Sequence, residues 1–401
     1  MGVASKINSN NNLKINIFFD KSASMGGYLT NGPKRGEEDD NFKNKVRTFL
    51  SYFSDTSFDE KLKIYLLDGG KVESYKNKIK SAGDLVGEFS DGMDEDWGFR
   101  NGKDTPIHTI FENIFKNKDT SSINIFFTES IMSYPTDKIK KEPYANQDSD
   151  GLKGKVTGAF AKYQKDFGIS VYAFLSKFDG TYFNHSNQPE SCCLTNLRPF
   201  YIWVIGRKSL MPKFTNYIIN DKKFKAREEL HIGWQYNAPK HTILSSEGRA
   251  GGWDYVDTTH IEKLPLGETI KFTIGLDLKS YPINVQDEKY LKENIEVDNL
   301  VKKESVIVKK QSDFFKTISS EQQNDLKPYT HFITLELNNN AISTKNTLSI
   351  KLKKKNSTWY EKWSTENDKD INKKENNKKT FAFKELIEGI LEAYKQNEYY
   401  F

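Results

Sequence analysis

The sequence predicts an α/β domain with a doubly wound, mostly parallel sheet, followed by a β-sandwich-like domain and a C-terminal helix. Two patterns support this prediction. In residues 13–220, short apolar runs alternate with stretches whose apolar residues recur at helical spacing, which is typical of β-α-β units. In residues 222–355, apolar and polar residues mostly alternate, which indicates half-buried strands. The length of 401 residues leaves room for both domains and a further C-terminal segment.

The first domain is predicted from apolar runs with the length and composition of buried strands. These runs cover residues 15–19, 62–67, 123–127, 170–175 and 200–206. Apolar residues at helical spacing are found in residues 39–54, 107–115, 151–167 and 212–219. Helices that connect parallel strands should cover both faces of the sheet. A polar insertion at about residues 178–197 precedes the last strand.

In the second domain the alternation is clearest in residues 270–278, where Ile270, Phe272 and Ile274 would share one side. Similar stretches occur at 306–308, 331–337 and 347–352. Turn residues between these stretches favour an antiparallel sandwich. The last part, residues 356–401, contains an aromatic segment, a polar linker and a helix with one apolar face. That face needs a partner surface, either on this chain or on another protein.

Basic and acidic residues nearly balance, since 60 Lys and Arg stand against 55 Asp and Glu. A dedicated nucleic-acid binder would show a concentrated basic face, so we do not expect nucleic acid as a partner. No apolar run approaches the roughly 20 residues that cross a membrane, so we expect no membrane partner.

The cysteine pattern favours a cytoplasmic location. Cys192 and Cys193 are adjacent and are the only cysteines, so they cannot form a disulfide framework. The polar N-terminal stretch lacks the apolar region of a signal peptide. A signal peptide that was removed earlier stays an open alternative.

The candidate site begins at the end of the first apolar run. Asp20 follows this run directly, and Ser22 and Ser24 come at alternate positions after it. Open α/β sheets place their ligands at the carboxyl ends of strands. One carboxylate and two hydroxyls are hard oxygen donors, so the pattern predicts Mg²⁺, with Mn²⁺ or Ca²⁺ as alternatives.

Two later positions offer the same chemistry. Thr105 precedes Pro106 at a predicted helix start, and Glu129 follows Thr128 at the end of a predicted strand. In this order, D-x-S-x-S, T-P and T-E-S resemble the motifs of the von Willebrand factor A domain, a Rossmann-like fold with a metal-ion-dependent adhesion site. The resemblance covers about residues 13–220. It implies a metal site formed by Asp20, Ser22, Ser24, Thr105 and Glu129.

The sequence departs from this family at two neighbouring positions. Glu129 stands where the family has Asp, and Ser130 stands where it has Gly. Glutamate is one methylene longer than aspartate, so Glu129 either coordinates the ion directly or turns away and weakens the site. A glycine position often requires a positive φ, which other residues adopt less readily.

The resemblance implies a metal-dependent protein–protein interaction module within a multi-protein bacterial system. A partner protein would present an Asp or Glu that completes the coordination of the ion. The alternatives are a metal-dependent hydrolase or phosphatase with Asp20 as nucleophile, and a scaffold subunit with an empty metal site. Phosphatases of the haloacid-dehalogenase type need a second Asp where this chain has Ser22. We therefore expect no enzyme activity.

Overall fold

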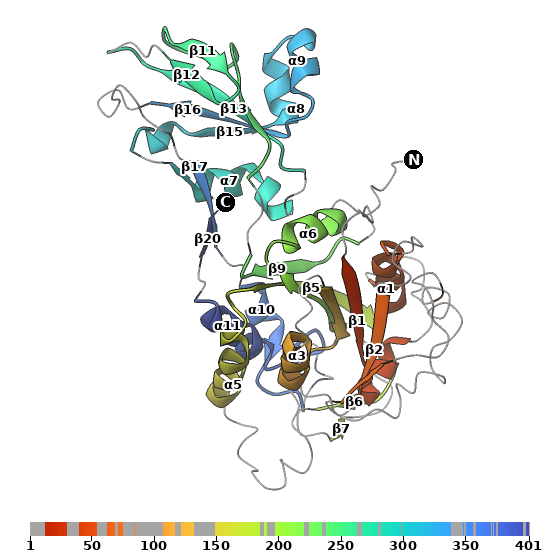
Figure 1. Cartoon of the computed structure of the whole chain (residues 1–401). Coiled ribbons are helices and arrows are strands. Elements are labelled where there is room, and N and C mark those ends of the chain that lie inside the picture. Colours follow the sequence, from red (N-terminus) through yellow and green to blue (C-terminus); the bar gives the residue numbers. More distant parts are fainter. Residues whose placement is uncertain are drawn as a thin grey trace. The chain divides into compact units, whose positions relative to one another are not determined.

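Figure 1 shows the computed structural model of the whole chain. The structure describes residues 13–29, 40–53, 62–68, 71–74, 84, 107–116, 122–131, 149–184, 188–190, 197–219, 224–234, 238–262, 267–279, 281, 283–297, 299–337, 348, 350–355, 358–369, 371, 373, 376–395 and 398–400. The chain forms two compact units. The first contains residues 1–234 and 357–397, and the second contains residues 235–356 and 398–401.

The first unit contains a seven-stranded sheet with the order β3-β2-β1-β4-β8-β5-β9. Figure 1 labels β1, β2, β5 and β9 of this sheet. Its strands are β1 (Lys14–Asp20), β2 (Leu62–Asp68), β3 (Lys71–Ser74), β4 (Ser122–Thr128), β5 (Phe167–Lys177), β8 (Leu197–Arg207) and β9 (Glu228–Ile232). β1 pairs in parallel with both β2 and β4, whereas the other neighbouring strands pair antiparallel. The sheet is therefore mixed, and the expected parallel pairing is found in its β2-β1-β4 part.

The connection between β5 and β8 explains the antiparallel pairing on that side. A parallel return needs a long crossover, which is usually a helix. The described part of residues 178–196 instead contains the short strands β6 (Tyr182–Phe183) and β7 (Pro189–Glu190). β8 therefore runs back beside β5 and lies between β5 and β4. The insertion is not only polar, because it also buries Phe178 and Tyr182 completely.

Helices cover both faces of this sheet, as predicted. They are α1 (Phe42–Ser51), α3 (Ile107–Lys116), α5 (Ser149–Ala161), α6 (Met211–Ile219), α10 (Trp359–Lys362) and α11 (Phe383–Ala393). Phe126 and Phe127 are consecutive on β4 and so point to opposite faces. Phe127 packs on Phe49 of α1 and Phe126 on Phe111 of α3, with ring centroids 5.9 and 6.2 Å apart. Phe111 also packs on Phe160 of α5.

The C-terminal helix packs on its own chain, where α11 lies beside α5 (Figure 1). The Thr157 hydroxyl donates to the Gly389 carbonyl at 3.1 Å. A Cβ atom on Gly389 would lie only 2.8 Å from the Lys153 carbonyl oxygen, so glycine permits this close approach. Residues 357–397 therefore belong to the first unit and not to a separate third part.

The first unit also extends beyond the predicted limit of residue 220. β9 pairs with β5 along Glu228–Ile232 and forms an edge of the seven-stranded sheet. The unit therefore ends at residue 234, and the second unit begins at 235 instead of 222.

The second unit contains small antiparallel sheets and short helices. Its four-stranded sheet has the order β10-β13-β16-β15. The elements are β10 (His241–Ile243), β11 (Asp254–Asp257), β12 (His260–Glu262), β13 (Lys271–Leu276), α7 (Glu288–Asn294), β14 (Ile295–Val297), β15 (Ile307–Lys310), α8 (Gln311–Phe314), α9 (Ser320–Leu326), β16 (His331–Glu336), β17 (Ile350–Lys355) and β20 (Glu398–Tyr400). Phe272 and Ile274 oppose Leu335 and Ile333, which confirms the predicted shared side.

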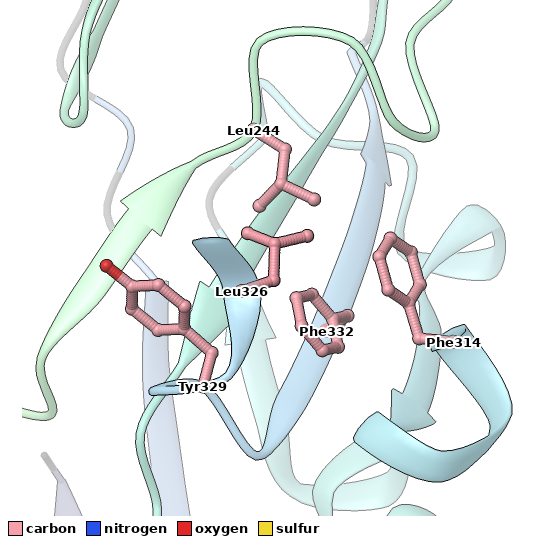
Figure 2. Close-up of a cluster of buried hydrophobic side chains, with 5 residues drawn as sticks. All are labelled: Leu244, Phe314, Leu326, Tyr329 and Phe332. Atoms are coloured by element: carbon pink, nitrogen blue, oxygen red, sulfur yellow. The ribbon is translucent and has the colours of Figure 1, made fainter. Parts of the chain in front are cut away.

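One face of the four-stranded sheet is covered by helices. Figure 2 shows Phe332 of β16 facing Phe314 of α8, and their rings stack with centroids 4.0 Å apart. Leu244, Leu326 of α9 and Tyr329 complete this buried cluster. Phe332 alternates with Ile333 and Leu335 along β16, so α8 and α9 cover the face opposite to the predicted apolar side. These helices were not predicted, because they are too short to produce a visible helical period in the sequence.

Candidate metal centre

The carboxyl ends of β1 and β4 bring the predicted residues together. The two strands are neighbours and parallel, so Asp20 at the end of β1 lies beside Thr128 at the end of β4. Asp20, Ser24 and Glu129 are each no more than 5% exposed. Ser22 is half-buried and provides the more open side. The sequence predicted this convergence, and the register confirms that the two strand ends meet.

Asp20 fixes the geometry of the loop that follows it. One carboxylate oxygen, Oδ1, accepts a hydrogen bond from the Ser22 backbone N–H at 2.9 Å. The other, Oδ2, accepts from the Thr128 hydroxyl at 2.7 Å. Asp side chains often stabilise turns by bonding to the backbone two residues later. Asp20 thus positions residues 21–29, which we call the serine loop, and ties this loop to β4.

The serine loop directs its Ser24 hydroxyl toward Glu129. Residues Ala23–Leu29 form the 3-10 helix η1, and the Met25 N–H donates to the Ser22 carbonyl at 3.0 Å. The Ser24 hydroxyl donates to Glu129 Oε1, and the Ser22 and Ser24 hydroxyl oxygens are 3.5 Å apart. Of the two orientations considered for Glu129, the structure has the inward one.

Ser130 adopts the conformation for which a glycine would be preferred. Its φ is 58°, in the left-handed region. Its backbone N–H donates to the Thr128 hydroxyl at 2.9 Å, and its own hydroxyl accepts from the Trp203 indole at 2.9 Å. These two hydrogen bonds compensate for the backbone strain, so serine replaces glycine without loss of the turn.

Glu129 is an unusual carboxyl group. Burial raises its pKa to about 8; the hydrogen bond from Ser24 opposes this shift, and the nearby Asp20 charge adds to it. Its second oxygen, Oε2, is buried and has no hydrogen-bond partner among the described residues. A buried polar atom without a partner is energetically costly. The oxygen atoms of Asp20, Ser22, Ser24 and Glu129 fit a hard divalent cation.

Thr105, the remaining predicted ligand, lies outside the described residues, as do Pro106, Cys192 and Cys193. In the described part of the chain, no group of three or more His, Cys, Asp or Glu side chains is arranged to hold a metal ion. The candidate centre is of another kind, because it combines two carboxylates with two hydroxyls.

Sequence reasoning missed two charged groups near this centre. Arg198 is 1% exposed at the start of β8, and Asp368 is fully buried in the Lys- and Asn-rich stretch before α11. The charges of both side chains affect the pKa of Glu129. Arg198 beside an apolar strand was a visible signal, but nothing in the polar stretch distinguished Asp368 from its exposed neighbours.

Searches against protein-family models, curated proteins and solved structures find no match to this chain. Among the described helices, none is long and apolar enough to cross a membrane.

Proposed function

We propose that this chain binds a partner protein through a divalent metal ion. Asp20, Ser22, Ser24 and Glu129 would hold Mg²⁺, or Mn²⁺ or Ca²⁺ in its place, and the family resemblance adds Thr105. The observation that carries the proposal is the buried Glu129 oxygen that lacks a partner beside Ser24. A divalent cation would supply that partner and favour the ionised carboxylate.

The partner should be a protein surface that presents an Asp or Glu side chain. Asp20, Ser22, Ser24 and Glu129 would supply four ligands and Thr105 a fifth, so an octahedral ion would keep at least one coordination position that a further carboxylate can fill. The half-buried Ser22 side of the centre offers the approach. Binding would then depend on the metal, and a chelator would release the partner.

The proposal extends to the fold. We interpret the first unit as a variant of the von Willebrand factor A domain. Its motif-bearing strands would be the parallel β2-β1-β4 group, and the antiparallel β8 would be a departure from the family's parallel sheet.

The phosphatase alternative is less well supported. Both Asp20 oxygens accept hydrogen bonds, from the Ser22 N–H and the Thr128 hydroxyl, and Asp20 is only 5% exposed. Such low exposure restricts the access of a phosphate ester to Asp20, and Ser22 stands where these phosphatases need a second Asp. The scaffold alternative, with an empty metal site, is separated from the proposal by direct measurement of metal binding.

Isothermal titration calorimetry with Mg²⁺ and Mn²⁺ tests the proposal. The full-length protein should bind one ion at this centre, and Glu129→Gln should weaken binding at least tenfold while keeping the side-chain shape. Glu385→Gln is the matched control, because Glu385 is also a buried carboxyl with an oxygen that lacks a partner, but lies on α11. Equal affinities of the wild type and Glu129→Gln would refute the site, and no binding by the wild type would favour the scaffold.

A further inference from the structure

A loop near the C-terminus lies beside the strand end that carries Glu129. We call residues 364–381 the C-terminal loop. Its ends pair with each other as β18 (Ser364–Thr365) and β19 (Thr380–Phe381). The Tyr201 hydroxyl of β8 donates to the Thr380 hydroxyl at 3.0 Å, and Tyr201 is the residue that pairs with Thr128 at the end of β4. The loop is therefore anchored next to the candidate centre.

Arg198 holds the C-terminal loop from inside the protein. Its guanidinium donates to the Asn377 and Lys379 carbonyls, both at 3.4 Å, and lies 4.2 Å from the ring centroid of Tyr182. Arg198 is only 1% exposed, and its Nε has no hydrogen-bond partner among the described residues. Neutral acceptors do not balance a buried positive charge, so the guanidinium depends on nearby carboxylates.

Two buried carboxyl groups can balance the charge of Arg198, one in the C-terminal loop and one in the candidate centre. Asp368 belongs to the C-terminal loop, is fully buried and accepts a hydrogen bond from the Tyr182 hydroxyl at 2.8 Å. Glu129 belongs to the candidate centre and is 4% exposed. Burial is the main cause that raises the pKa of Glu129, but Arg198 lowers this pKa and Asp368 raises it. The charges of Glu129 and Asp368 also favour the charged form of Arg198, so the three charges interact with one another.

The serine loop also reaches the neighbourhood of Arg198. Tyr28 of η1 donates its hydroxyl proton to the Pro199 carbonyl at 2.5 Å. Its ring packs against Phe178, with centroids 5.1 Å apart, and the Asp179 N–H donates to the Gly27 carbonyl at 2.9 Å. The loop that carries Ser22 and Ser24 thus rests on the residue next to Arg198.

We propose that Arg198 couples the candidate centre to the C-terminal loop, so that a cation bound beside Glu129 and the docked loop stabilise each other. This inference rests on the proposed metal function. With the loop docked, the negative charge of Asp368 balances the guanidinium of Arg198. These two side chains together then carry no net charge that would repel the cation. With the loop displaced, Arg198 is unbalanced and repels the cation. Because coupling between two binding events is reciprocal, the bound cation also favours loop docking.

The first experiment measures Mg²⁺ and Mn²⁺ affinity of the full-length protein by calorimetry. Asp368→Asn removes the charge of Asp368 but keeps an acceptor for Tyr182, and it should weaken metal binding at least about fivefold. The matched control is Glu366→Gln, which removes an exposed negative charge from the same loop and should leave the affinity unchanged. Bound metal should also slow tryptic cleavage between Thr365 and Thr380 in the wild type and not in Asp368→Asn.

The second experiment needs no metal. Urea unfolding constants are measured at pH 9 with a chelator for Glu129→Gln, Asp368→Asn and the double variant. Either carboxylate alone still balances Arg198, but the double variant leaves it unbalanced. The double variant should therefore unfold at least about fivefold more readily than the product of the two single effects.

The outcomes separate the two proposals. Unchanged metal affinity in Asp368→Asn, or single effects that simply multiply in the unfolding constants, would overturn the coupling. A wild type that binds neither ion would refute the metal function and the coupling to a cation with it. Non-multiplicative unfolding constants would then show only that Arg198 links Glu129 to Asp368.

Discussion

Replacement of Glu129 by Gln should change how the stability of the metal-free protein depends on pH. Burial raises the pKa of Glu129 from 4.5 to about 8 in the folded chain, whereas the unfolded chain exposes this carboxyl to water. Because the folded-state pKa is the higher one, the fold favours the protonated form. The stability that this group contributes is complete below pH 4.5 and is lost as the pH rises to about 8.

The size of the effect follows from the two pKa values. Each pH unit between them is worth about 1.4 kcal/mol, so the interval from 4.5 to about 8 corresponds to about 5 kcal/mol. This is large beside the roughly 5–15 kcal/mol by which native proteins are stable. Gln cannot ionise, so the variant should escape this loss. The free energy of unfolding of the wild type should fall by up to about 5 kcal/mol relative to Glu129→Gln between pH 5 and pH 9.

Urea denaturation of the full-length protein in the presence of a chelator measures this difference at a series of pH values. Asp166→Asn is the control, because its carboxylate is 61% exposed in the same unit. The control should follow the wild type throughout. If the curves of the wild type and Glu129→Gln run parallel from pH 5 to pH 9, the reasoning on burial is refuted.

Four further predictions follow from other features. Binding of Mg²⁺ at pH 7 should release close to one proton, because Glu129 must ionise; calorimetry in buffers of different ionisation enthalpy would show it, and an absence of buffer dependence would contradict it. Ser130→Val places a β-branched residue at a φ of 58° and removes the acceptor for an indole, so thermal unfolding should report a loss of about 1–3 kcal/mol, larger than for Ser130→Gly. Gly389→Val should force α11 away from α5 because its Cβ would meet the Lys153 carbonyl; chemical denaturation should show a loss of about 1–3 kcal/mol, and unchanged stability would disprove the close contact. Phe332→Ala should cost about 3–5 kcal/mol in urea unfolding of the second unit, with metal affinity at the first unit as the unaffected control.

The candidate centre could be predicted largely because its residues follow strands directly. Asp20 and Glu129 each come after an apolar run, and the parallel pairing of those runs places both side chains at one edge of the sheet. The orientation of Glu129 could not be predicted, because it depends on the hydrogen bond from Ser24 and on the surrounding burial. The positive φ of Ser130 was anticipated as a requirement of the position, but the indole of Trp203 that helps to satisfy it comes from β8.

The second unit was harder to predict for a physical reason. Apolar and polar residues alternate clearly in its strands, so β13 and β16 and the side on which their apolar residues lie could be predicted. Its helices are too short to show a period, although Ser319 and Gln322 form a capping box that marks the start of α9. The helices cover the face that carries Phe332, opposite to the apolar side on which a second sheet was expected.

Local residue patterns were enough to predict the local features of this protein. The apolar runs specify the central strands, helical spacing specifies the helices on both faces, and the oxygen-bearing residues after the strands define the candidate site. The tertiary packing determines that β8 separates β4 from β5, that α11 packs on α5, and that the charges of Arg198 and Asp368 both act on Glu129. These arrangements involve residues up to hundreds of positions apart. They depend on which apolar surfaces become buried against each other and on which buried charges are balanced. A local pattern of residues does not predict these long-range contacts.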